Sequence, residues 1–246
     1  MAVQAWTALS ILHGPLEVAC NAKSWTGPAV TVAELDTTAL CDTWQKRIGG
    51  LKSYSWSAEL MQDFAVDSID EETWAALATA NTPCSVMPAG STSGSKAYLM
   101  PTLSLAYNPL TATVGEIGMA SLAGSGTGPA ARGKVLHPNG TARTSSSTGT
   151  AYQLGAISAT QRMYGALHVT FASGTNPTLI IKLQSSSTEG GSYSDRITFT
   201  TATGLTSQWS SVAGAVTDTW WRASWTIGGT GTPTFQFGFT AGKATP

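Results

Sequence analysis

Polar and apolar side chains alternate along residues 54–64. The even-numbered positions carry large or apolar side chains with one polar exception, and the odd-numbered positions carry mostly serine and acidic residues. Because successive side chains of a β-strand point to opposite faces, this period of two predicts a long, half-buried strand. The face expected to be buried consists of Tyr54, Trp56, Ala58, Leu60, Gln62 and Phe64.

One amphipathic helix is predicted directly after this strand, over about residues 68–80. Ser68 followed by Glu71 matches a capping box, in which each side chain bonds a free backbone N–H of the first turn. The sequence Asn81-Thr82-Pro83 is typical of a helix end. An acidic first turn and an apolar stripe complete the pattern: Asp70, Glu71, Glu72, Trp74, Leu77 and Ala78.

Residues 36–50 have no clear period and are predicted to form a long loop or an arm. Long structured loops in compact domains usually contact a partner. On either side, alternating patterns indicate shorter strands near residues 30–35, 97–107, 114–122 and 132–137, with a glycine-rich loop between the last two.

The second half of the chain has a cleaner alternation, which predicts a β-sandwich. Apolar positions alternate over residues 163–171, 179–183, 197–199, 221–227 and 235–239, and residues 228–233 are consistent with a hairpin loop between the last two runs. Residues 144–150, rich in Ser and Thr, indicate an interdomain linker. We therefore expect a first domain over residues 1–145 and a second, over residues 146–246, that can fold alone.

Composition and charge narrow the class of protein. Only 11% of the 246 residues are charged, while nine Trp, six Tyr and six Phe supply ample core, which is typical of a β-rich globular chain. Residues 1–120 hold eleven acidic and five basic side chains, a balance of −6, and residues 121–246 hold three acidic and eight basic ones, a balance of +5. Neither half is basic enough to indicate nucleic-acid binding, and a net charge near zero favours self-association.

Cysteine usage suits a reducing compartment. Cys20, Cys41 and Cys84 are odd in number and lack the spacing of a metal site, so buried free thiols are expected. Such thiols fit assembly in a cytoplasm. No stretch reaches the ~18 apolar residues of a membrane span, so no membrane partner is expected.

No group of residues predicts catalysis, a cofactor or a metal site. His13, His137 and His168 stand singly, and His168 is expected on the solvated face of its strand. There is no G-x-S-x-G sequence to mark a serine nucleophile. The acidic residues between positions 63 and 72 lack the spacing of a calcium loop, and residues 124–128, GSGTG, lack the Gly-Lys-Ser/Thr ending of a phosphate loop. The prediction is a protein that is not an enzyme.

Two neighbouring side chains are candidates for binding. If Trp221 and Trp225 face inward, Trp220 and Arg222 face outward. An exposed Trp beside Arg suits a protein interface or a sugar-stacking platform, and an edge position covered by a loop is the alternative. Met61, on the otherwise polar face of the first strand, is a candidate subunit contact.

Several short motifs carry a resemblance to a known family. In the first half they are Asp36-Thr37-Thr38, the long loop, Tyr54 and Trp56, Asp67-Ser68-Ile69-Asp70 opening the helix, Pro83, Val86 and Val114-Gly115-Glu116. In this order they resemble the tail tube (major tail) proteins of long-tailed bacteriophages, over roughly residues 1–140. The second half looks like the sandwich modules of phage structural proteins, through Ala166-Leu167-His168-Val169, Ser173-Gly174-Thr175, Asp218-Thr219-Trp220-Trp221-Arg222 and residues 235–239.

The resemblance implies a virion structural protein without a cofactor. Tail tube subunits have an N-terminal two-sheet β-sandwich or barrel with one flanking helix, and they assemble into stacked hexameric rings through which DNA passes without specific binding. A C-terminal sandwich would lie outside the tube. The implied partners are further copies of the chain and the tape measure, terminator and distal tail proteins, and the implied location is the virion tail, assembled in the host cytoplasm.

The family's long loop reaches the adjacent ring, and residues 36–50 match it in position. The candidate contacts between subunits or rings are therefore Asp36, Trp44, Lys46 and Arg47, together with Met61. The lumen of such tubes is usually electronegative, which is compatible with the −6 balance of residues 1–120. Two other functions stay open: a module that binds carbohydrate, such as host-surface glycans, through Trp220, and a capsid decoration protein.

Overall fold

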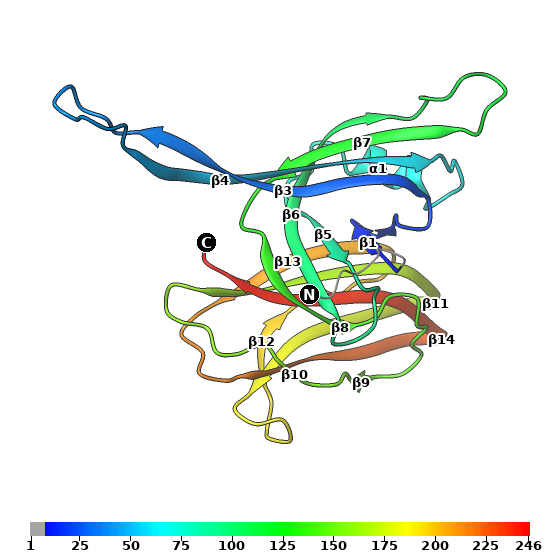
Figure 1. Cartoon of the computed structure of the whole chain (residues 1–246). Coiled ribbons are helices and arrows are strands. Elements are labelled where there is room, and N and C mark those ends of the chain that lie inside the picture. Colours follow the sequence, from blue (N-terminus) through cyan, green and yellow to red (C-terminus); the bar gives the residue numbers. More distant parts are fainter. Residues whose placement is uncertain (1–7) are drawn as a thin grey trace.

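A computed structural model describes residues 8–246, and the chain is mainly β, as the sequence predicts. Figure 1 shows an upper body, which contains α1 and the long strands β3, β4 and β7, and a lower body built around β11 and β14. Within the described residues, fourteen strands form one hydrogen-bonded network. The elements are β1 (Ser10–His13), β2 (Leu16–Glu17), β3 (Ala22–Asp36), β4 (Arg47–Met61), α1 (Ile69–Ala75), β5 (Thr82–Met87), β6 (Lys96–Asn108), β7 (Met119–Gly126), β8 (Ala131–His137), β9 (Ser147–Thr148), β10 (Tyr152–Gln153), β11 (Arg162–Ser186), β12 (Ser194–Thr198), β13 (Thr206–Ala213) and β14 (Trp220–Ala244).

The upper core confirms the alternating pattern up to Leu60. Tyr54, Trp56, Ala58 and Leu60 are all buried, and the ring of Trp25 stacks on Trp56 with centroids 5.1 Å apart. Large apolar side chains contribute roughly 1.5–3 kcal/mol each when fully buried. This alternating face of β4 therefore anchors the upper body.

The pattern fails at the end of the strand. β4 ends at Met61, and Phe64, expected to be buried, is 64% exposed. The Gln62 side-chain amide donates to the Tyr107 hydroxyl at 2.7 Å and to the Pro109 carbonyl at 3.1 Å. These bonds fix the Gln62 side chain at the end of the strand, and the residues after Gln62 leave the sheet.

α1 covers only seven residues, so the helix is shorter than predicted. The Ser68 side chain makes no capping bond, and Glu71 accepts the backbone N–H of Asp67 at 3.0 Å instead of that of Ser68. Trp74, expected in the apolar stripe, is 64% exposed, since the helix buries only Ile69 and Thr73. Beyond it, residues 77–78 bond β6 and end the helical geometry.

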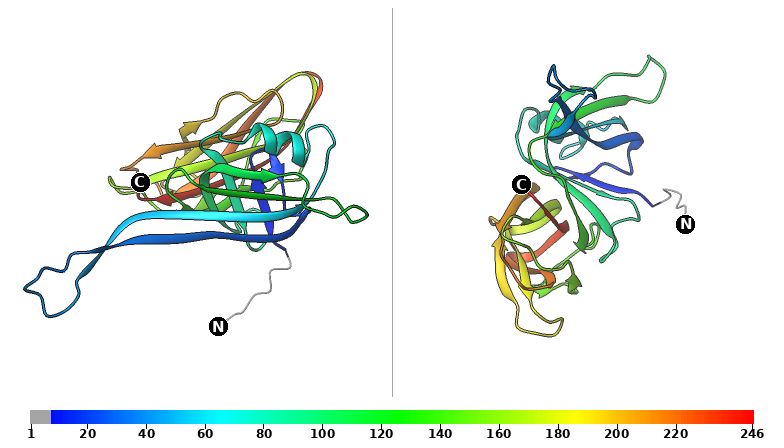
Figure 2. Two further views of the ribbon diagram at one scale, coloured as in Figure 1. Left: turned by 90° about the horizontal axis from the view of Figure 1, so that it is seen from above. Right: turned by 60° about the vertical axis from the view of Figure 1, so that its left-hand side comes forward.

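β11 and β14 each run for 25 residues and pair antiparallel from Arg162↔Ala244 to Ser186↔Trp220. The predicted hairpin at residues 228–233 is therefore wrong, because β14 continues through it without reversing. Register shifts in the middle of the pair let both strands bend from one layer of the sandwich to the other (Figure 2). The bend folds both halves of β14 onto one core, which includes Trp221, Trp225, Phe235, Phe237 and Phe239.

β8 joins the two bodies. Its residues 131–134 pair with β6 of the upper body, and its residues 132–137 pair with β14 of the lower body. At this seam a Cβ on Gly133 would lie 1.8 Å from the Ala241 carbonyl oxygen, so only glycine fits. The predicted linker, residues 144–150, contains β9, which also pairs with β14. The domain boundary between residues 145 and 146 stays a prediction.

Candidate assembly surface

β3 and β4 form a hairpin arm that reaches beyond the upper body (Figures 1 and 2). The two strands pair from Ala22↔Leu60 to Asp36↔Arg47, so the predicted long loop is confined to residues 37–46. A bulge places an extra residue in β4 opposite Val32 and Glu34. Such a bulge resets the alternation of side chains, which is why the sequence shows no clear period here.

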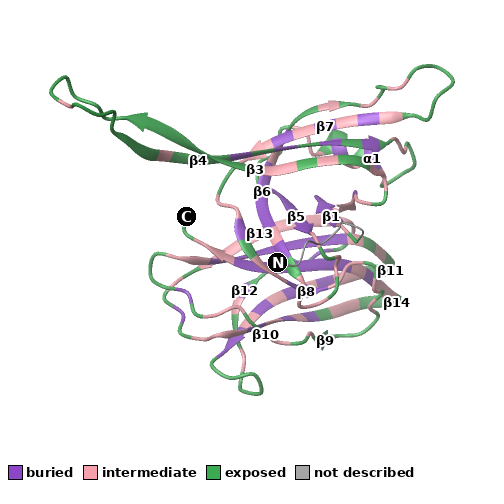
Figure 3. Ribbon diagram, in the orientation of Figure 1, coloured by how far each residue is buried: buried purple, intermediate pink, exposed green. Residues whose placement is uncertain are grey.

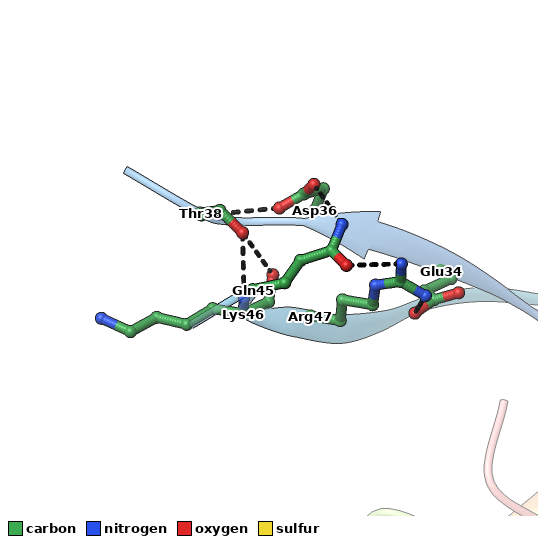
Figure 4. Close-up of polar contacts among 6 residues, drawn as sticks. All are labelled: Glu34, Asp36, Thr38, Gln45, Lys46 and Arg47. Carbon is green, nitrogen blue, oxygen red and sulfur yellow. Dashed lines mark hydrogen bonds and ion pairs between the residues drawn. The ribbon is translucent and has the colours of Figure 1, made fainter. Parts of the chain in front are cut away.

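The tip of the arm is held by side-chain bonds to its own backbone (Figure 4). Asp36 accepts the Thr38 N–H at 2.8 Å and the Gln45 amide at 3.1 Å, and these bonds hold the pKa of Asp36 below its ordinary value. The Thr38 hydroxyl accepts the Lys46 N–H at 2.9 Å. Arg47 pairs with Glu34 and donates to Gln45 at 2.8 Å, so the tip has a defined conformation.

Large apolar side chains are exposed along the outer part of the arm. Figure 3 shows this ribbon exposed on both faces, and Trp44 and Leu51 are 84% and 87% exposed. The predicted contacts Asp36, Trp44, Lys46 and Arg47 all lie at this tip. The outer arm, defined as residues 30–52, exposes Val30, Val32, Leu35, Leu40, Trp44, Ile48 and Leu51.

Met61, the fifth predicted contact, lies at the other end of β4 and is 42% exposed. At the rise of a strand, this places it about 45 Å from Arg47 along the strand. Two loops and α1 meet there, tied by Gln62, Tyr107 and Asp70, with the Tyr107 hydroxyl 2.7 Å from Asp70 Oδ1. This surface, called the α1 end, exposes Met61, Phe64, Val66, Trp74, Leu110, Val114 and Ile117.

Sequence reasoning missed most of the α1 end. Phe64 and Trp74 are predicted to be buried, and residues 114–122 are predicted to form a strand. β7 begins only at Met119, so the strand prediction is wrong for residues 114–118. Their apolar character was visible, whereas their shared location depends on the pairing of β4 with β7 and on the Gln62 bonds.

One face of the sheet formed by β3, β4 and β7 is rich in hydroxyl groups. The register places the same-face neighbours together, with Ser24 opposite Glu59 and Thr31 opposite Ser53. Glu59 is the only charged side chain in the set. The serine face consists of Ser24, Thr26, Thr31, Ser53, Ser55, Ser57, Glu59, Ser121, Ala123 and Ser125.

Two strand edges of the arm have no neighbour within the described chain. β3 pairs only with β4, and β4 pairs with β7 only from Ser55 onward, so its Arg47–Tyr54 segment has one free edge. A groove of about 720 Å³ lies along that edge. It is lined by Val30, Leu51, Tyr54 and residues 126–130 and 244–246, among others.

Trp220 and Arg222 lie at the start of β14 in the lower body, and both are half-buried. Trp221 faces inward and is fully buried, as the alternation predicts. The Arg222 guanidinium lies 3.9 Å from the centroid of the Tyr193 ring and donates to Gln184 at 2.9 Å. A binding role for this pair stays a prediction.

The prediction that His168 lies on the solvated face of its strand is wrong, because its side chain is fully buried. Its Nε2 lies 2.9 Å from the Ser85 hydroxyl, and its Nδ1 lies 2.7 Å from the Gly14 carbonyl oxygen. Burial lowers the pKa of both His168 and the equally buried His13 to about 4. Ser85 is also fully buried, so the Ser–His contact is out of reach of a substrate and joins the two bodies instead.

The expectation of three buried thiols is correct only for Cys84. Cys20 and Cys41 are free and exposed, whereas burial raises the pKa of Cys84 to about 12. Among residues 8–246, no three His, Cys, Asp or Glu side chains gather as a metal site would require. In the same range, no helix has the length and apolar character needed to cross a membrane.

No protein-family model and no curated protein matches the chain. Solved structures do match at low identity. A chain of the virion of a native gene transfer agent particle is 16% identical, with a TM-score of 0.42, over 53% of this chain and 98% of that one. A chain of the sheath/tube terminator of the PVC extracellular contractile injection system is 7% identical, with a TM-score of 0.43, over 54% and 97%.

A third match covers almost the whole chain. The Dit protein of SPP1, from a hub adsorption apparatus of Gram-positive infecting phages, is 9% identical, with a TM-score of 0.36, over 97% of this chain and 100% of that one. Identities and TM-scores at this level assign the chain to none of these families.

Proposed function

We propose that the chain is a structural protein of a bacteriophage tail, which self-assembles into hexameric rings that stack into a tube. The observation that carries the proposal is the outer arm, where seven large apolar side chains are exposed on a ribbon. Exposed apolar patches of this kind mark protein interfaces. The resemblance of residues 1–140 to tail tube proteins supplies the class of assembly.

The free edges of β3 and β4 support the same proposal. Unpaired backbone N–H and C=O groups on an edge strand are a template for pairing with another chain. In a ring, a strand of the neighbouring copy would pair there and continue the sheet into a barrel. The side chains along the groove at the arm would then be covered by that neighbour.

The serine face suits the lumen of such a tube. It carries hydroxyl groups and one carboxylate, Glu59, without Lys or Arg among its members. Phosphate groups bind mainly through positive charge, so DNA would pass this face without being held. The C-terminal sandwich would lie outside, and the tape measure, terminator and distal tail proteins would meet the tube at its ends.

Negative-stain microscopy of the purified chain tests the proposal, with one arm variant and one matched control. Leu35 and Ile48 are paired neighbours on the arm, 49% and 55% exposed, so Leu35→Ser with Ile48→Ser should leave the fold intact and remove apolar contact area. We expect rings and tubes from the wild-type chain and mainly monomers from this variant. Phe171→Ser, at a 43% exposed position of β11, should assemble as wild type does.

Wild-type monomers that persist across concentration, ionic strength and time would overturn the proposal. Rings that never stack would overturn the tube and favour a terminator or hub. Normal assembly of the arm variant would show that the arm is not the contact.

A further inference from the structure

The α1 end carries six carboxylates, and one basic side chain, Lys23, lies close by in β3, between the pairs Ala22↔Leu60 and Ser24↔Glu59. Between residues 53 and 95 the sequence contains no Lys or Arg. Burial and the charges of Asp67 and Glu71 raise the pKa of Glu72, so these carboxylates interact. No ion pair joins them to a cation of the described chain. The acids of this end are Asp63, Asp67, Asp70, Glu71, Glu72 and Glu116.

The outer arm carries three cations. Lys46, Arg47 and Lys52 are the three Lys or Arg residues between positions 24 and 95. Two of these cations are already engaged on the arm, since Lys46 pairs with Asp42 and Arg47 pairs with Glu34. Asp36 accepts backbone and amide N–H groups. Lys52 is exposed and forms no ion pair within the described chain.

Both ends also expose apolar side chains that a contact would cover. The outer arm exposes seven large apolar side chains, and the α1 end exposes seven, including Met61. Two α1 ends cannot pair with one another, because six carboxylates on each side would repel. The outer arm offers the α1 end apolar area and one unpaired cation, Lys52.

We propose that the outer arm of one copy docks on the α1 end of the next copy. The inference rests on the proposed function and deepens it by naming the partner surface. Arm and α1 end lie at opposite ends of β4, so the contact is heterologous and repeats in one direction from copy to copy. A contact of that kind builds rings or filaments, whereas an arm-to-arm contact would stop at a dimer.

Charge reversal on each surface tests the docking. The arm variant is Lys46→Glu with Lys52→Glu, and the α1 variant is Glu72→Lys with Glu116→Lys, whose side chains make no hydrogen bond in the structure. By sedimentation velocity, each variant should need at least about tenfold more protein for half-assembly than wild type, because like charges then face each other. The chain that carries all four substitutions should recover assembly.

A mixture gives a second, independent measurement. In the mixture a native arm meets a native α1 end and a reversed arm meets a reversed α1 end, so the two variants should co-assemble in alternation although neither assembles alone. Lys96→Glu and Glu189→Lys, exposed positions away from both surfaces, are the matched controls and should assemble normally.

The outcomes separate this inference from the proposed function. Wild-type assembly with unaffected variants, or impaired variants that the fourfold chain does not rescue, would overturn the docking and leave self-assembly standing. Absence of wild-type assembly would overturn the proposed function, and the docking with it.

Discussion

His168 shows at the scale of one residue what alternation can and cannot predict. The pattern correctly places Leu167 and Val169 in the core of the lower body, and it puts His168 on the other face of β11. That face is not solvated, because Ser85 of β5 and the carbonyl of Gly14 cover it. A period of two gives the side of a strand, but the layer that covers that side comes from residues 80 or more positions away.

The buried histidines should make stability depend on pH. His13 and His168 have pKa values of about 4 in the folded chain against 6.5 when unfolded. Between these values the unfolded chain binds more protons, so the free energy of unfolding falls as the pH drops from 6.5 toward 4. Each histidine accounts for roughly 2 kcal/mol of that loss at pH 5.

Urea unfolding of wild type and His168→Gln at pH 7 and pH 5 measures this effect. Glutamine can keep hydrogen bonds to Ser85 and Gly14 but does not titrate. The variant should therefore lose roughly 2 kcal/mol less than wild type between the two pH values, whatever its stability at pH 7. Parallel pH dependences would contradict the burial of a neutral histidine at this position.

At the scale of elements, the sequence predicts best where one strand packs on one core. The buried face of β4 up to Leu60 was predictable from alternation alone. Residues 36–50 of the outer arm are predicted as a long loop or an arm, because the bulge at Val32 and Glu34 breaks the period and because neither face is buried. The candidate contacts at its tip rest on the resemblance alone. The bend in β11 and β14 escaped because Gly and Pro at residues 228–233 are equally typical of a turn.

The serine face gives a prediction about one sheet. Ser55→Lys with Ser57→Lys adds two cations to exposed positions of β4, where no Lys or Arg now lies among the same-face neighbours. Tubes of this variant should retain DNA in co-sedimentation at low salt, while wild-type tubes should not, because phosphate binding follows positive charge. Ser192→Lys with Ser194→Lys, in the lower body, should not retain DNA within the tube. Equal DNA retention by all three would place the serine face outside the lumen.

At the scale of the whole molecule, each body has a large core of its own, and two smaller clusters that include Val135 and Ala131 of β8 lie between them. Leu136 of β8 belongs to the lower core, although residues 131–134 of the same strand pair with β6 of the upper body. The sequence could indicate two halves, because composition, charge and alternation all change near the middle. It could not assign β8, since a strand of seven residues reads alike whichever neighbour it pairs with.

Two fragments decide where the second domain begins. A fragment of residues 146–246 lacks β8, so one edge of β14 loses its pairing over residues 239–243 and the lower core loses Leu136. Removal of a buried Leu side chain alone costs roughly 2–5 kcal/mol, and the free edge adds a site for aggregation. A fragment of residues 128–246 keeps both the β8 pairing and Leu136.

In urea unfolding followed by tryptophan fluorescence, we expect one cooperative transition for residues 128–246 and a much earlier transition, or none, for residues 146–246. Equal midpoints would support the boundary at residue 146 and make β8 a neighbour of the sandwich. The expected result makes β8 a strand of both bodies. A force that the next copy exerts on the outer arm would then be transmitted to the lower body through one continuous sheet.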